Sequence, residues 1–205
     1  MLGLGKKSSI EDGSVSEKRD FGRKLGAALA SKCSSEIGIR SCTVLLPEES
    51  ATFVDSKILS ELSESFMEGL YADNRYKTGD KKKIPAENLE IVRLIIERRA
   101  QAEDSKEEEV KLNAAISIGL SLAKGVYLTK DIVNSPHNVL NSVSLAETAK
   151  RIAYESGGQL KCNILEKEDC ESRGMGAYLG VARGSETPPK FIHLVYKPKG
   201  KTGNL

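Results

Sequence analysis

The sequence has no tryptophan, few other aromatic residues and no excess of charge of either sign. Aromatic residues make up 5% of the 205 positions, too few for the base-stacking surface of a single-strand nucleic-acid binder. Lys and Arg total 31 against 29 for Asp and Glu, and this net charge of +2 is too small to draw the chain to nucleic acid or anionic lipid. No apolar run approaches about 20 residues, and the N-terminus turns polar too soon for a signal peptide. We therefore expect no nucleic-acid partner and no membrane partner.

Metal-binding spacings of cysteine and histidine are also missing. No Cys-x-x-Cys pair occurs, and the two histidines, His137 and His193, are far apart in the sequence. A structural zinc site is therefore not expected. We expect reduced, half-buried thiols in an intracellular protein at the four cysteines: Cys33, Cys42, Cys162 and Cys170.

Glycine-rich stretches do not form a nucleotide site. Gly5-Lys6 and Gly200-Lys201-Thr202 lack the earlier glycine that a Walker phosphate loop requires. The glycines at 174, 176 and 180 are spaced one residue too far apart for a dinucleotide fingerprint, and they follow a predicted helix instead of a strand. Both interpretations are rejected.

The first half of the chain alternates helical and extended patterns. Apolar spacing predicts a helix from Ser16 to about Glu36 and a strand over 42–46. Asp55 or Ser56 is expected to cap a helix that runs to about Asp73, and a strand follows over 89–96. This order predicts an α/β layer. The lysines at 81–83, between these elements, indicate either a phosphate or RNA contact or, as we favour, a solvated loop.

A long helix is predicted over 105–133. Ser105 and Glu108 form a capping-box pattern at its start. Apolar residues cover most of its circumference, which is typical of a helix between two packed layers. Gly119 and Gly125 each weaken a helix, so we expect close packing at both positions.

The remaining residues predict a second set of α/β elements. Pro136 ends the long helix, and Ser144 with Glu147 forms a second capping-box pattern. Strands are expected over 160–164 and, in a buried position, over 191–196, with a short polar helix over 166–173 between them.

Four short motifs in this half resemble the leucyl aminopeptidases, the cytosol-type family of di-metal peptidases. The resemblance covers roughly a third of the chain strongly and the upstream part collinearly. Asn141-Ser142 departs from the Thr-Pro-like pair usual in the family. The motifs are the Asn134-x-Pro136-x-Asn138 turn, Leu145-Ala146-Glu147, Met175–Leu179 and Pro188–Leu194.

This resemblance implies an α/β protein in three parts. Residues 1–104 would be a partial N-terminal α/β domain, 105–133 a connector helix, and 134–205 the start of a metallo-aminopeptidase catalytic domain, with the chain shortened at both ends. The family uses two divalent metals, Mn or Zn, held by a lysine, aspartates and a glutamate. No carboxylate follows Glu186 in this sequence. We therefore assign no catalytic, cofactor-binding or metal-binding residue, and we expect the chain to be inactive alone.

The implied function is metal-dependent hydrolysis of the N-terminal residue, leucine and similar, from peptides. The alternative is a non-catalytic assembly or interaction protein that keeps the N-terminal domain. The resemblance also implies peptide substrates, a homo-oligomer (a hexamer in the family) and a cytoplasmic location. A plastid location is the alternative if a transit peptide is missing from this N-terminus.

Overall fold

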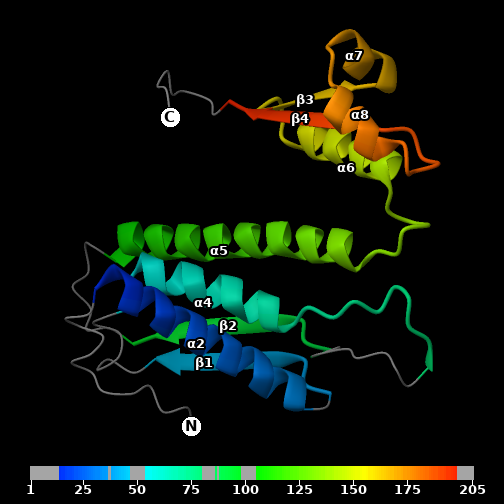
Figure 1. Ribbon diagram of the computed structural model, residues 1–205. Helices are drawn as coiled ribbons and strands as arrows, with labels where there is room; N and C mark the ends of the chain where they lie inside the picture. The colour runs from blue at the N-terminus through cyan, green and yellow to red at the C-terminus, as the bar shows by residue number, and fades with distance from the viewer. Residues whose placement is uncertain are drawn as a thin grey trace. The chain divides into compact units, whose positions relative to one another are not determined.

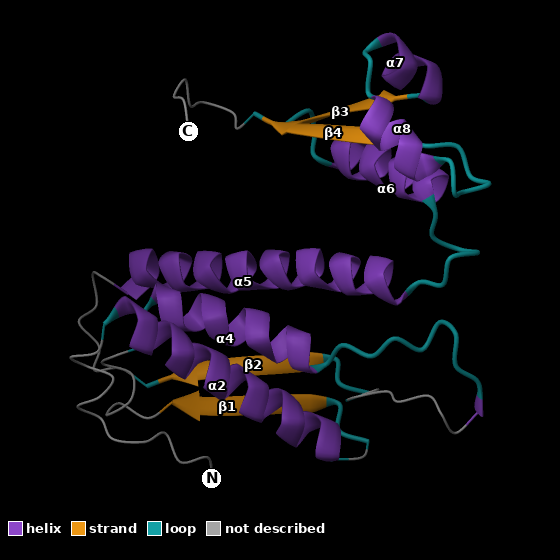
Figure 2. Cartoon of the chain, in the orientation of Figure 1, coloured by secondary structure: helices purple, strands orange, loops and turns teal. Residues whose placement is uncertain are grey.

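The computed structural model describes residues 14–36, 38–46, 54–79, 86, 88–97 and 105–197. The chain divides into two compact units, Met1–Val133 (unit 1) and Asn134–Leu205 (unit 2). Each unit combines helices with a two-stranded sheet, so the predicted mixed α/β class is confirmed (Figures 1 and 2). The lysines at 81–83 and the glycine–lysine pairs near the two ends of the chain lie outside the described residues.

Unit 1 is built on a parallel pair of strands. β1 (Ser41–Leu46) pairs with β2 (Ile91–Ile96) in register, from Ser41 opposite Ile91 to Leu46 opposite Ile96. Parallel strands need a crossover connection, and α4 (Ser56–Gly69) lies between them in the sequence. Figure 1 shows α4 and α2 (Val15–Ser35) on the same side of this sheet.

Side-chain caps fix where the two helices begin. Ser14 accepts a hydrogen bond from the Glu17 N–H at 3.3 Å, and Glu17 accepts one from the Ser14 N–H at 2.6 Å, which completes a capping box. Asp55 caps α4 by accepting from the Lys57 and Ile58 N–H groups. The expectation that α4 runs to Asp73 is wrong, because the helix ends at Gly69.

Glycines allow α2 and α4 to approach backbone to backbone. A Cβ at Gly26 would lie 2.4 Å from the Leu62 carbonyl oxygen, and one at Gly22 would lie 2.6 Å from that of Ile58. Only a residue without a side chain fits at such a distance. The close approach closes a core of buried apolar side chains that includes Leu25, Leu29, Ala30, Cys33 and Phe66.

A buried carboxylate also joins these helices. Glu61 of α4 is 7% exposed and accepts hydrogen bonds from Arg19 and, at 2.8 Å, from Arg23 Nε. Both arginine side chains are about half exposed, so water can reach them if the carboxylate is removed. The pair therefore contributes less to stability than a fully buried one.

We expect Glu61→Ala to lower the free energy of unfolding by about 1–2 kcal/mol, measured by urea titration. Asp20→Asn is the control, because Asp20 meets Arg23 only at 3.5 Å on the surface. It should cost less than about 0.5 kcal/mol. Equal losses in the two variants would contradict a special role for the buried carboxylate.

The long helix α5 (Ser105–Asn134) is covered on one side only within unit 1. Ala115 and Ala123 are buried, whereas Val110, Ile118 and Leu122 are half or more exposed. The expectation that both sides are packed is therefore wrong within this unit. Ser105 begins the helix, but its side chain lies outside the described atoms, so its predicted cap stays a prediction.

The two glycines of α5 differ. A Cβ at Gly119 would lie 2.2 Å from the Ser60 carbonyl oxygen of α4, which confirms the predicted close packing there. At Gly125 no atom of the described residues lies within 4 Å of such a Cβ, so the same prediction is wrong at that position.

By length and composition alone, α5 could also cross a membrane. An 18-residue window within Lys106–Asn134 reaches a mean hydropathy of 1.2. Core helices of soluble proteins have the same properties, and Gly119 and Ala115 pack against α4 and the unit 1 core. The hydropathy is therefore weak evidence for a membrane span.

The C-terminal end of α5 is attached to the segment that follows α4. The Tyr71 hydroxyl donates a hydrogen bond to Asp131 at 2.8 Å, and its ring lies edge-on to that of Tyr127 at 5.0 Å. The Tyr127 hydroxyl donates to the Met67 carbonyl, and Arg75 donates to the Asp131 carbonyl at 2.8 Å. Burial raises the pKa of Tyr127, so the neutral phenol that this contact requires is favoured. These contacts fix the last turns of the helix.

Unit 2 contains an antiparallel pair of strands and short helices. β3 (Leu160–Leu165) pairs with β4 (Phe191–Tyr196), with Leu160 opposite Tyr196. α6 (Ser142–Glu155) packs on the sheet, and α7 (Lys167–Ser172) and α8 (Gly176–Ala182) connect the strands. The expectation that the strand over 191–196 is buried is wrong here. Phe191, Leu194 and Tyr196 are exposed, because among the described strands only β3 pairs with β4.

Candidate functional site

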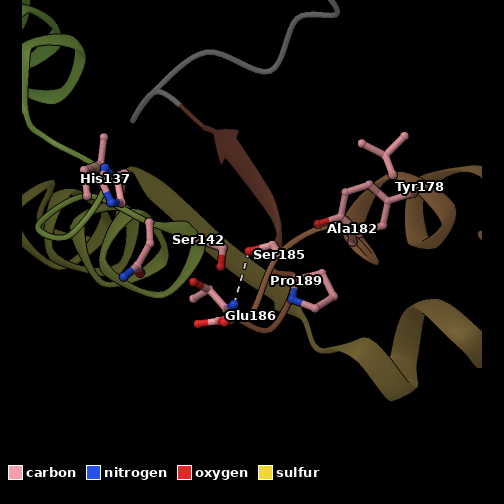
Figure 3. Close-up of a pocket in the computed structure, with 12 residues that line it drawn as sticks. His137, Ser142, Tyr178, Ala182, Ser185, Glu186 and Pro189 are labelled. Carbon is pink, nitrogen blue, oxygen red and sulfur yellow. Dashed lines mark hydrogen bonds between the residues drawn. The ribbon is translucent and has the colours of Figure 1, made fainter.

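Unit 2 has an open pocket of about 650 Å³ between the start of α6, α8 and the loop before β4. Figure 3 shows Ser142, Ser185, Glu186 and Pro189 close together, with His137 and Tyr178 on opposite sides of them. The wall is partly apolar and includes Leu140, Val181 and Ala182. Because the pocket combines apolar walls with a few polar groups, it is the candidate binding site of this unit.

The turn before α6 forms the first wall. Pro136 cannot continue α5, and its carbonyl accepts hydrogen bonds from the Val139 and Leu140 N–H groups, each at 2.9 Å. The chain therefore turns tightly and places His137 and Leu140 beside the first residues of α6.

The cap of α6 is Asn141, not Ser144. Asn141 Oδ1 accepts from the Val143 N–H at 3.0 Å and from the Ser144 N–H at 3.1 Å. Ser144 Oγ in turn accepts from the Asn141 N–H at 2.9 Å. Glu147, the expected partner of Ser144, instead pairs with Lys150 at 2.8 Å on the surface. The predicted Ser144–Glu147 capping box is therefore wrong by one turn.

We expect Asn141→Ala to lower the free energy of unfolding of unit 2 by about 1 kcal/mol, because two N–H groups lose their acceptor. Glu147→Gln should change it by no more than about 0.5 kcal/mol. Hydrogen exchange of the α6 amides measures both. A larger loss in Glu147→Gln than in Asn141→Ala would instead support the Ser144–Glu147 capping box.

One long-range hydrogen bond joins the two sides of the pocket. Ser142 Oγ donates to the Pro188 carbonyl at 2.6 Å, across 46 positions of sequence. The loop itself is held by Ser185 Oγ, which accepts from the Thr187 N–H at 3.1 Å. On the α8 side, the Tyr178 ring lies edge-on to Phe191 of β4 at 5.9 Å. These contacts hold the start of α6, α8 and the loop before β4 together around the pocket.

This arrangement is suited to binding more than to covalent catalysis. The Ser142 hydroxyl donates its hydrogen bond to a carbonyl oxygen, and a carbonyl does not act as the general base that an activated serine needs. Glu186 supplies one carboxylate at the rim beside the apolar wall. Such a rim favours a ligand with a cationic group next to an apolar one.

The described residues do not fit a two-metal centre. Over residues 14–197, outside the gaps given above, no three His, Cys, Asp or Glu side chains come together in a way that could hold a metal ion. Divalent ions such as Mn²⁺ need several oxygen-rich ligands. The assignment of no catalytic, cofactor or metal residue stays a prediction. The pocket itself was not predicted from the sequence.

Comparison with known proteins indicates which protein family the chain resembles. Residues 127–204 match the profile of the cytosol aminopeptidase family, catalytic domain. A probable cytosol aminopeptidase of Rippkaea orientalis is 36% identical over 201 residues, which is 98% of this chain and 35% of that protein.

Solved structures agree with this match. A tomato leucine aminopeptidase mutant superimposes with a TM-score of 0.65 at 30% identity, covering 92% of this chain and 34% of that one. A bottromycin maturation enzyme in complex with Mn shares the fold, with a TM-score of 0.66 at 22% identity over 97% of this chain and 36% of that one. The chain spans about a third of the length of the curated relatives that it matches. The chain is therefore similar along nearly its whole length to cytosol aminopeptidases, and residues 127–204 match the catalytic domain of that family.

Proposed function

We propose that the protein acts in peptide turnover as an aminopeptidase, releasing the N-terminal residue, leucine or similar, from peptides. The match to the family over nearly the whole chain carries this proposal. In this proposal unit 1, with its long helix α5, forms a scaffold, and unit 2 supplies elements of the catalytic domain.

In such an enzyme two divalent metals, Mn or Zn, polarise the peptide carbonyl and lower the pKa of a bound water. The described residues do not fit that pair of ions, so no step of the reaction is assigned to them. We propose that these 205 residues alone are inactive. In the active protein these residues would supply the scaffold, a surface for association and the pocket beside Ser142.

The expected result is no turnover of a leucyl anilide by the purified chain with Mn²⁺ or Zn²⁺ added. Protein captured from its source with an antibody against this chain should hydrolyse the anilide and lose that activity to a chelator. Turnover by the purified chain, free of contaminating peptidase, would contradict the proposed inactivity. A captured protein of full activity in chelator would contradict the metal-dependent function.

A non-catalytic assembly protein is the second candidate. The exposed apolar side of α5 favours it, because such a surface on a soluble protein marks an interaction site. Capture of an inactive protein with the 22.3 kDa mass of this chain would support this candidate. In either case we propose a cytoplasmic homo-oligomer.

A further inference from the structure

Two cysteines of unit 1 lie near the junction of α2 and β1. Cys33 lies in the last turns of α2 and is 2% exposed. Cys42 is the second residue of β1, on the side of the strand that also carries Val44 and Leu46 toward the helices. The connection between the two elements is short and turns at Gly38, whose φ of +79° suits glycine.

The two cysteines share one packed region of unit 1. Cys42 packs against the buried cluster that contains Cys33. All four cysteines are free thiols in this structure. Because both side chains belong to this packed region, an S–S bond of roughly 2 Å forms if their sulfur atoms come together there.

The two thiols differ in accessibility. Burial, followed by the hydrogen bond and charge interaction with Cys42, raises the pKa of Cys33 to about 11. Cys33 is therefore protonated at neutral pH and shielded from solvent. Cys42 is half-buried, so a small reagent reaches it first.

We propose that Cys33 and Cys42 form a modification site, a thiol pair that a small disulfide such as glutathione disulfide converts into an intramolecular disulfide. The Cys42 thiolate attacks one sulfur of glutathione disulfide, forming a mixed disulfide and releasing one glutathione thiolate. Cys33 then gives its proton to solvent, and its sulfur attacks Cys42 Sγ, releasing the second glutathione. Two protein thiols are oxidised, and one glutathione disulfide is reduced to two glutathione molecules.

The resulting bond would join the end of α2 to the start of strand β1, and it would close a loop over residues 33–42. A closed loop has fewer unfolded conformations, so the oxidised chain should unfold at a temperature about 5 °C or more above that of the reduced chain. The reaction should be reversed by dithiothreitol.

Tryptic mapping of the full chain after incubation with glutathione disulfide tests the proposal. Trypsin cuts after Lys32 and Arg40, so the two cysteines fall on separate peptides that only a disulfide holds together. We expect the linked peptide pair in the wild-type chain and a stable glutathione adduct on Cys42 in Cys33→Ala. The wild-type mapping does not depend on how well that variant folds.

The double variant Cys162→Ser/Cys170→Ser is the matched control. It removes the other half-buried and buried cysteines, which lie in unit 2, and it should still give the linked peptides. The proposal is overturned if the wild type carries only glutathione on Cys42, or if Cys162 or Cys170 is linked to either partner as readily.

Discussion

Gly119→Ala is expected to destabilise unit 1 by about 2–3 kcal/mol, although alanine favours a helix more than glycine does. The new Cβ would lie 2.2 Å from the Ser60 carbonyl oxygen and 3.0 Å from the Glu64 backbone nitrogen. Both are backbone atoms of α4, so neither can rotate away. The helices must separate, and the core contacts of Ala115 weaken. Urea unfolding followed by circular dichroism measures the loss.

Gly125→Ala is the matched control on the same helix. No atom of the described chain lies within 4 Å of a Cβ there, so only the helix propensity changes. It should stabilise the protein by up to about 1 kcal/mol. If both variants shifted stability in the same direction, α5 would not approach α4 closely at Gly119.

Charging the exposed side of α5 is expected to weaken self-association of the chain strongly. Ile118 and Leu122 are 55% and 50% exposed and lie one helical turn apart. With Val15 and Arg19 of α2 they line a groove of about 550 Å³. Burying two such side chains stabilises a contact by several kcal/mol, and placing two lysines there reverses the effect. The double variant Ile118→Lys/Leu122→Lys should weaken association at least about 100-fold.

Light scattering at micromolar concentration gives the masses, and Ser117→Lys/Ser121→Lys is the control. It adds the same charge to the same helix at exposed polar positions and should leave association unchanged. A wild-type chain that is a clean monomer would contradict the proposed role of this surface. Co-sedimentation of the wild type with neutral lipid vesicles, lost in the lysine variant, would identify a membrane as the occupant instead.

Local patterns in the sequence placed the described strands and most of the described helices, although they did not predict α8 (Gly176–Ala182). Alternating apolar residues at 160, 162 and 164 predicted β3, and their burial alternates as expected. The cap of α6 could not be settled in this way, because Asn141 and Ser144 are both good caps three residues apart. Only their reciprocal hydrogen bonds show that Asn141 is the cap.

Whether a strand is buried depends on which other strands and helices pack against it, and a local sequence pattern does not show this. Phe191–Tyr196 is apolar enough for a central strand, but among the described strands it pairs only with β3, and most of its residues are exposed. The pocket was missed for a similar reason. Its two sides meet through the Ser142–Pro188 hydrogen bond, which joins positions 46 residues apart and leaves no local signal. The motifs at 134–138 and 188–194 identified the family without indicating that they adjoin one cavity.

We propose that the chain shares the fold of the cytosol aminopeptidases and that its described residues hold no metal centre. Calorimetric titration of the 205-residue chain with Mn²⁺ at neutral pH tests this most directly. We predict no saturable heat and no rise in the unfolding temperature, because the described residues do not offer a set of metal ligands. Saturable binding of one or two Mn²⁺ ions per chain, with stabilisation that a chelator reverses, would contradict the claim.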